Sequence, residues 1–528
     1  MRSGSRGGCY RNGAGRVKPA AARKRLSHTF PQIRPERARG AFAFGRGNGY
    51  HPRPVSGKEE DARLRELGGG RILPLLWKFA WPALVTMTLN TLYNVIDRVY
   101  IGHGCGSDAI AGLTLTFPVM MVMGAFGPLI GVGSGTIISI SLGERNLLRA
   151  ERALGQCVAL KLLLGATVAP ALFLLLDPIL HAMAGGGVTD GALAAARLYL
   201  RINVLFHFLA HLAFGLSACM RSEGSPVAAM RCMVVGAVAN LVLDPLFIFE
   251  RVDLRVVSLP GLGLGVAGAA WATNIAMGLA CAAALLHYTG GRSVVALRLR
   301  HVRVYRDLVP RVLAIGLSPF LMQFAGSTIN FSLNRAFAHW SASQAEGTVQ
   351  VAAFGIFMSV SFLFFVPSMG IQQGFAPIIG YNWGARNLAR VRRSLDLAVA
   401  LTTCCVATAC LCQLLLARPL AGCFSDVAEV TRAGAFALRI GNCMIWCIGV
   451  NVAATTYFQA VGRPRTAILL SLLRQVIVLL PCVWVLPRVL PIRPLLAVWL
   501  SLPISDVIAN LATVPPLLRE RRALRASP

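Results

Sequence analysis

The sequence predicts an all-α integral membrane protein with twelve transmembrane helices in two six-helix repeats. Apolar residues make up 55% of its 528 positions and charged residues only 14%, a balance that ordinary soluble domains do not show. Long apolar stretches recur about every 35 to 40 residues, and each can span a hydrocarbon core of about 30 Å at 1.5 Å per residue. Two short motifs also repeat, one in each half of the chain.

The predicted helices fall into two sets of six. The first set comprises residues 72–101, 109–140, 153–178, 192–220, 226–249 and 265–287. The second set comprises residues 308–337, 349–382, 391–416, 432–461, 466–487 and 494–518. The chain then divides into a basic extension (1–70), an N-lobe (71–290), a basic linker (291–307), a C-lobe (308–518) and a basic tail (519–528).

Local signals delimit these helices. The first apolar stretch ends at the polar loop HGCGSDA, so residues 102–108 are expected to be a loop. The second carries Gly127, Gly131 and Gly135 at four-residue spacing, a surface that lets another helix pack closely. The loops GERNLLRAER and RSEGSP separate the next helices.

The two halves resemble each other in sequence. Residues 142–149, LGERNLLR, match residues 383–390, WGARNLAR, and each motif follows an even-numbered helix. Aligning Pro82 with Pro319 places Asn334 opposite Asp97. Six spans per repeat give both copies the same orientation, with a substrate cleft where the two lobes meet.

The net charge of +30 does not indicate nucleic-acid binding, because the Lys and Arg residues gather in the extension and in alternate loops. This bias predicts a multi-pass protein of the plasma (inner) membrane with both termini cytoplasmic. The segments assigned to the cytoplasmic side are 145–161, 221–231, 292–311, 386–393, 463–474 and 519–525.

The extension 1–70 is Arg/Gly/Ala-rich and is expected to be disordered. We favour a start codon placed too far upstream over a basic tail that touches anionic lipid, and a transit peptide is a weaker alternative. The fourteen cysteines contain no C-x-x-C pair and mostly lie in apolar runs, so neither a disulfide framework nor a metal site is predicted.

Two acids in the N-lobe call for a functional explanation. A carboxylate inside a spanning helix costs roughly 2.5 to 3.5 kcal/mol, so Asp97 and Asp244 are expected to face a partner, a cavity or an ion. Asn240 lies one turn before Asp244, and Pro245 frees a backbone acceptor, which together make a cation cage that could hold a proton or Na⁺. Tyr93 and Thr273 offer hydroxyls. The alternative is two separately satisfied acids near helix ends.

The C-lobe is different, because its first helix carries no acid between Arg311 and Ala345. Its polar candidates are Gln323, Asn334, Arg474 and Asp506, although Arg474 could simply mark a cytoplasmic helix end.

Two apparent motifs are rejected. Gly263, Gly265 and Gly268 spell G-x-G-x-x-G, but they open a spanning helix and have no βαβ context. His207 and His211 are spaced like metal ligands, but without an intervening Glu they read as packing residues or proton-relay candidates.

From about residue 71 to 518 the chain resembles the multidrug and toxic compound extrusion (MATE) family. The motifs that carry the resemblance are Pro82 with Asn94-x-x-Asp97, LGERN, N-x-x-x-D-P, GVAGAAWAT and QQGFAPIIGYNWGARN. Details such as LNRAFAH are closest to the bacterial MepA-like branch.

This resemblance implies a V-shaped, monomeric antiporter that exports small cationic or amphipathic compounds in exchange for H⁺ or Na⁺, without a cofactor, a bound metal other than Na⁺, or a nucleic-acid partner. It assigns the coupling cation to Tyr93, Asp97, Asn240, Asp244 and Thr273. The acid that another branch of the family places in the seventh helix is missing here. A lipid-linked oligosaccharide flippase of the same superfamily is the alternative, and a membrane enzyme is more distant because the sequence shows no nucleophile or catalytic metal motif.

Overall fold

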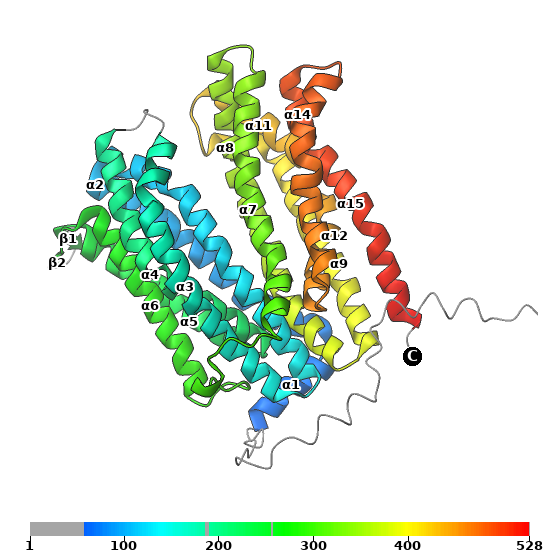
Figure 1. The fold of residues 1–528 in the computed structure, drawn as a ribbon. Helices are drawn as coiled ribbons and strands as arrows, with labels where there is room; N and C mark the ends of the chain where they lie inside the picture. The colour runs from blue at the N-terminus through cyan, green and yellow to red at the C-terminus, as the bar shows by residue number, and fades with distance from the viewer. Residues whose placement is uncertain (1–57, 185–188, 255–256, 527–528) are drawn as a thin grey trace, which may run out of the picture. The chain divides into compact units, whose positions relative to one another are not determined.

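Helices dominate the part of the chain that the computed structural model describes, which is residues 58–184, 189–254 and 257–526 (Figure 1). Eleven helices in these ranges are long and apolar enough to cross a membrane, and a bent pair supplies a twelfth span. The prediction of twelve transmembrane helices is therefore confirmed. The sheet found in these ranges is a hairpin of β1 (Arg251–Leu254) and β2 (Val257–Pro260).

The first half of the chain forms the N-lobe. Its helices are α1 (Lys58–Gly69), α2 (Ile72–Gly143), α3 (Leu147–Ala184), α4 (Asp190–Ser222), α5 (Pro226–Ile248) and α6 (Gly265–Thr289). Helix α2 contains two spans, Ile72–Gly106 and Asp108–Gly143, that join at Gly106. The loop expected at 102–108 is thus reduced to one break, where Gly106 has a φ of +80° that glycine adopts without a steric penalty.

The second half forms the C-lobe after the short helix η3 (Leu299–His301). Its elements are α7 (Val309–Trp340), α8 (Gln344–Gly384), α9 (Leu388–Leu415), α10 (Ala417–Gly422), α11 (Ala428–Asn442), η4 (Ile445–Cys447), α12 (Ile448–Ala460), α13 (Pro464–Leu472), η5 (Leu473–Leu479), α14 (Leu480–Val489) and α15 (Pro494–Ala526). The tenth span bends by 40° between α11 and α12. The eleventh widens into the π-helix η5 just before Pro481, which cannot donate to the helical ladder.

The internal repeat appears as two copies of one turn. Arg145 and Arg386, which match in the aligned motifs, have φ values of 57° and 58°. One residue later, the Asn146 side chain caps α3 by accepting from Arg149 N at 3.0 Å, and Asn387 caps α9 by accepting from Arg390 N at 3.2 Å. The same sequence therefore folds into the same helix connection twice.

Matching glycines bring the two lobes into close backbone contact beside these turns. A Cβ atom at Gly143 would lie 2.0 Å from the Tyr381 carbonyl oxygen, and one at Gly384 would lie 2.1 Å from the Ile140 carbonyl oxygen. Gly143 matches Gly384 in the aligned motifs, and Ile140 and Tyr381 each lie three residues before these glycines, so the contact is reciprocal. It is the relation expected for parallel repeats about an axis along the membrane normal.

Helix α1 departs from the sequence analysis, which expected disorder throughout residues 1–70. Leu67 of α1 is 1% exposed, and the Asn382 side-chain amide donates to its carbonyl oxygen at 3.0 Å. On the other side, Arg63 donates to the Ser225 hydroxyl at 3.0 Å. The end of the expected extension is therefore folded against both lobes, while residues 1–57 lie outside the described part of the chain.

Two buried carboxylates attach the basic linker to the N-lobe. Glu151 of α3 accepts from Arg298 at 3.3 Å, and Glu223 at the end of α4 accepts from the Val295 backbone N–H at 3.3 Å. Burial raises the pKa of the Glu223 carboxyl, and the hydrogen bond from His287 only partly opposes this effect. The linker therefore packs as part of the N-lobe.

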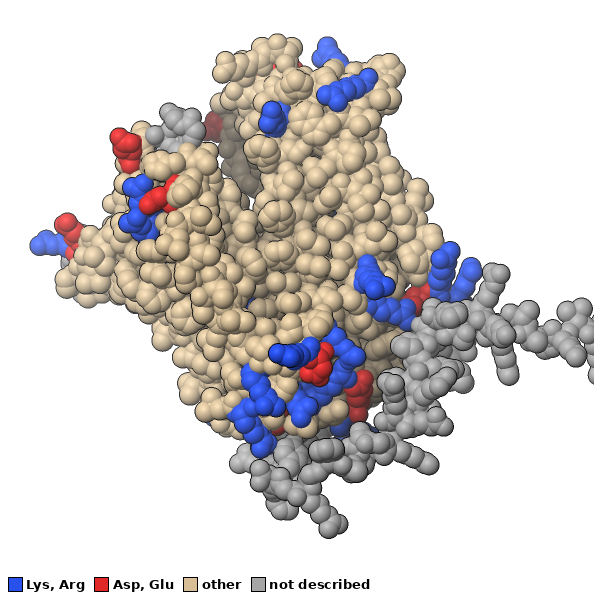
Figure 2. Space-filling model, in the orientation of Figure 1, with Lys and Arg blue, Asp and Glu red and all other residues tan. Residues whose placement is uncertain are grey.

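Charged side chains are unevenly distributed over the surface of the molecule. Figure 2 shows Lys and Arg gathered mainly at the end where α1 lies, with a smaller group at the opposite end and an uncharged band between them. This distribution matches a protein whose middle section faces lipid.

Candidate functional site

The two N-lobe acids are both buried. Asp97, on the first span of α2, is 7% exposed, and Asp244 on α5 is fully buried. Asn240 donates from its side-chain amide to Asp244 Oδ1 at 2.8 Å and to the Thr273 hydroxyl of α6 at 3.4 Å. The one-turn spacing of Asn240 and Asp244 in the sequence thus places them on one face of α5, beside α6.

Oxygen atoms in this cluster lack hydrogen-bond partners. Asp97 Oδ1, Asn240 Oδ1 and Asp244 Oδ2 are each buried without a donor within reach. Asp97 and Asp244 come from different helices but lie near enough for their negative charges to repel each other. Buried acceptor oxygens of this kind are suited to binding a proton or a hard cation such as Na⁺.

Asp97 could also have been an acid at the membrane boundary, paired with the neighbouring Arg98, but the described residues show no salt bridge between the two. Arg98 is exposed, and its guanidinium carbon lies 5.6 Å from the centre of the Phe117 ring. Asp97 therefore points into the bundle while its neighbour points out of it.

Tyr199 of α4 joins the cluster and was missed by the sequence analysis. It is 7% exposed and interacts electrostatically with Asp97, Asp244 and the half-buried Tyr93. One turn later, the buried Asn203 accepts from the Asn274 side-chain amide of α6 at 3.3 Å. A polar residue at every fourth position of α4 was the signal in the sequence that could have indicated this face.

The C-lobe candidates separate into a pair and two isolated residues. Arg474 of η5 donates from Nε to Asp506 Oδ1 of α15 at 2.6 Å, and Asp506 is 2% exposed. Arg474 is thus an ion-pair partner rather than only the mark of a helix end. Asn334 is exposed on α7, whereas Gln323 is half-buried with its amide nitrogen next to Gly124 of α2.

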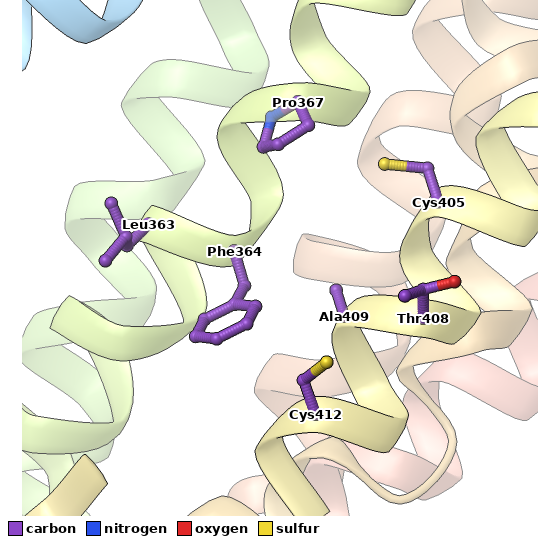
Figure 3. Close-up of a pocket in the computed structure, with 7 residues that line it drawn as sticks. All are labelled: Leu363, Phe364, Pro367, Cys405, Thr408, Ala409 and Cys412. Carbon is purple, nitrogen blue, oxygen red and sulfur yellow. The ribbon is translucent and has the colours of Figure 1, made fainter. Parts of the chain in front are cut away.

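A separate pocket of about 430 Å³ lies between α8 and α9 (Figure 3). It is lined by Leu363, Phe364, Pro367, Cys405, Thr408, Ala409 and Cys412. No acid contributes to this lining, so the pocket is distinct from the acid cluster of the N-lobe.

The described ranges contain no group of three or more His, Cys, Asp or Glu side chains that could hold a metal ion together. His207 and His211 are neighbours, with ring centroids 4.5 Å apart and the rings nearly perpendicular.

Comparison with known proteins agrees with this architecture. The MatE family model matches residues 82–246 and 322–484, one segment in each lobe. The chain is 26% identical over 465 residues to the multidrug export protein MepA of Staphylococcus saprophyticus, covering 88% of this chain and 97% of that protein. It is 25% identical over 472 residues to MepA of Staphylococcus aureus, covering 89% and 99%.

Solved structures have the same fold. A crystal structure of MATE in the bent conformation superposes with a TM-score of 0.79 at 24% identity, covering 88% of this chain and 98% of that one. An outward-facing multidrug resistance transporter of the MATE family gives 0.78 at 24% identity, covering 88% and 99%. Because the family model matches more than half of its length, the chain belongs to the MatE family.

Proposed function

We propose that this protein is a multidrug efflux antiporter, which exports organic cations or amphipathic xenobiotics in exchange for H⁺ or Na⁺ by alternating access. It would work as a monomer in the plasma (inner) membrane with both termini in the cytoplasm. The observation that carries the proposal is the pair of buried, interacting carboxylates, Asp97 and Asp244, with one unpartnered oxygen each.

Electrostatics explains how such a pair could couple two fluxes. Two negative charges at about 4 Å repel by about 4 kcal/mol at an effective dielectric constant of 20. A proton or Na⁺ relieves this repulsion, and so does a cationic drug. If the coupling ion favours one arrangement of the lobes and the drug favours the other, their competition for the negative site drives exchange.

Each helix in the cluster has a defined part in this mechanism. The first span of α2 carries Asp97 and also packs against the C-lobe, where a Cβ atom on Gly370 of α8 would lie 2.6 Å from the Leu84 side chain. Asn240 holds Asp244 through the 2.8 Å hydrogen bond and leaves its second oxygen available. The relatives named as multidrug export proteins support drugs as the exported compounds.

Transport by purified protein in proteoliposomes, with H⁺ and Na⁺ gradients imposed separately, tests the proposal. Asp97→Asn and Asp244→Asn remove charge at nearly constant volume, so folding should survive while gradient-driven drug export is lost. Asp426→Asn, at an exposed acid between α10 and α11, is the matched control and should transport normally.

Asn334→Asp, made in the Asp97→Asn background, should not restore coupling. Asn334 is exposed on α7 and far in sequence from the Asp244 partner that the N-lobe provides. Full coupled export by the Asp97→Asn, Asp244→Asn double variant at matched expression would refute the mechanism.

A further inference from the structure

The N-lobe contains a second buried ionisable group that the acid cluster does not use. Lys161 of α3 is 1% exposed, and its ammonium donates to the Gly127 carbonyl oxygen of α2 at 2.7 Å. None of the described carboxylates forms a salt bridge with it. The sequence analysis placed residue 161 among the cytoplasmic charges, but the structure places its side chain inside the bundle.

Glycines make the space that this lysine occupies. A Cβ atom at Gly215 of α4 would lie 2.6 Å from Lys161 Cε, so no larger residue fits there without displacing the lysine. The same Cβ atom would lie 3.3 Å from the Cys157 thiol sulfur, so this thiol borders the space as well. A basic group held inside a spanning bundle is costly, and such residues usually serve in ion or proton pathways.

The two histidines lie next to Lys161. His211 is 7% exposed, and its Nδ1 lies 3.5 Å from the position of a Cβ atom on Gly127, the same residue whose carbonyl binds Lys161. The His207 ring lies beside that of His211, with the two ring centroids 4.5 Å apart. Lys161 of α3 and His211 of α4 therefore meet at one glycine of α2, with His207 next to His211.

A row of polar side chains on α4 runs from the acid cluster toward these basic side chains. Tyr199, Asn203, His207 and His211 follow one another at four-residue spacing, so each lies one turn from the next. Tyr199 interacts with both acids, as described above. This row of polar side chains on α4 thus begins beside the acid cluster and ends at the two histidines next to Lys161.

Further buried polar atoms without partners lie on the two helices that Lys161 joins. They belong to Ser134 and Ser141 of α2 and to Gln156 and Glu151 of α3. The other carboxylate oxygen of Glu151 accepts from Arg298 of the linker at 3.3 Å. These atoms lie on the segments of α2 and α3 that lead to the turn at residues 144–146.

We propose that Lys161, His207 and His211 form a proton-transfer site linking the Asp97–Asp244 cluster to the end of the N-lobe where α2 and α3 meet. An imidazole can accept a proton at one ring nitrogen and release another from the second. A buried ammonium gives up its proton more readily than an exposed one. Lys161 would first release its own proton toward the end where α2 and α3 meet. The neutral amine would then accept the proton that the carboxyl cluster passes through His207 and His211, so that each group returns to its starting state.

This inference rests on the proposed antiport function, with H⁺ as the coupling ion. The first variant is His207→Gln/His211→Gln, which keeps polar side chains but cannot carry a proton. We expect drug export driven by a pH gradient to fall at least tenfold, while binding of tetraphenylphosphonium in detergent and drug-for-drug counterflow stay within twofold of the unmodified protein. Lys161→Met should give the same pattern, and His103→Gln, at an exposed histidine, is the control.

Other results would overturn the proton-transfer site. Unchanged pH-driven export by the double histidine variant would do so. Equal losses of counterflow and driven export, with a lower melting temperature, would show that the histidines are structural. Export driven by a Na⁺ gradient alone would remove the proton path and leave the drug-export function intact, whereas no drug transport under either gradient would contradict the proposed function itself.

Discussion

Docking of helix α1 gives a prediction whose size can be worked from the structure. Arg390, from the repeated motif of the C-lobe, donates from Nε to the Leu67 carbonyl at 3.2 Å and from Nη2 to the Gly70 carbonyl at 2.5 Å. These carbonyls at the end of α1 have no partner within the helix, so the arginine acts as a cap from another element. The Leu67 side chain is buried beneath them.

The expected loss of docking energy follows from these contacts. Truncating a buried leucine to alanine costs about 2 to 5 kcal/mol, and we take the lower value because α1 lies at the surface of the fold. A hydrogen bond to a charged group contributes about 1.5 to 3 kcal/mol, which we reduce to about 1 kcal/mol each because Arg390 is partly exposed. The Leu67→Ala, Arg390→Ala double variant should thus lose about 4 kcal/mol, or roughly a thousandfold in the docked-to-undocked ratio.

Limited trypsin digestion measures this ratio, because Arg65 and Arg71 flank the docked residue. The unmodified protein should be cut slowly at these sites and the double variant rapidly. Lys78→Gln, which removes only the exposed ion pair with Glu66, is the control and should leave the rate nearly unchanged. Equal cutting rates for the double variant and the unmodified protein would show that these contacts do not hold α1.

Truncated chains test whether the whole of α1 contributes to the stability of the fold. The sequence alone suggested that a chain starting near Arg71 would transport normally. With α1 folded against Ser225 and Asn382, a chain starting at Arg71 should melt at a lower temperature than a chain starting at Gly57. Equal melting temperatures for the two truncated chains would contradict the docking.

Three further predictions concern the rest of the fold. Single cysteines placed at Ser343 and at Asn387 in a cysteine-free background should differ in their labelling by a membrane-impermeant thiol reagent in intact cells. The reagent should label the first position and not the second, and the reverse pattern would overturn the proposed membrane orientation. Gly384→Val should lower the melting temperature by the equivalent of about 1 to 3 kcal/mol, because the new side chain meets the Ile140 carbonyl, whereas Gly422→Val, where there is open space, should not. Burial raises the pKa of Glu223 above its usual 4.5, so the folded chain holds this proton more tightly than the unfolded chain. The resulting stability is present below about pH 4.5 and is lost as pH rises through the raised pKa. As pH rises from about 4.5 through the raised pKa, Glu223→Gln should therefore become more stable relative to the unmodified protein. A difference in stability that does not change with pH would contradict the raised pKa.

Much of the architecture could be predicted from the sequence because its causes are local. Bilayer thickness sets the length of each apolar run, so twelve spans could be counted without knowing which helices touch. The pairing of Asn240 with Asp244 could be anticipated for the same reason, since residues four apart on a helix are always neighbours. The matching motifs with Arg145 and Arg386 form the same turn because the same short sequence meets the same backbone requirements.

Contacts between helices were decided only by the tertiary structure. Lys161 reads in sequence as one more charge near a basic loop, and its burial depends on the facing Gly127 and Gly215. In the sequence, Tyr199 looks like an ordinary tyrosine within an apolar run, and only the packing of α4 brings it near Asp97. Leu67 appears to belong to a polar extension, yet it docks because Asn382 and Arg390, more than three hundred residues away, meet the open end of its helix. Hydropathy reports how strongly a segment prefers lipid, but the side of a helix that faces a partner depends on residues distant in the chain, and only the folded packing brings them together.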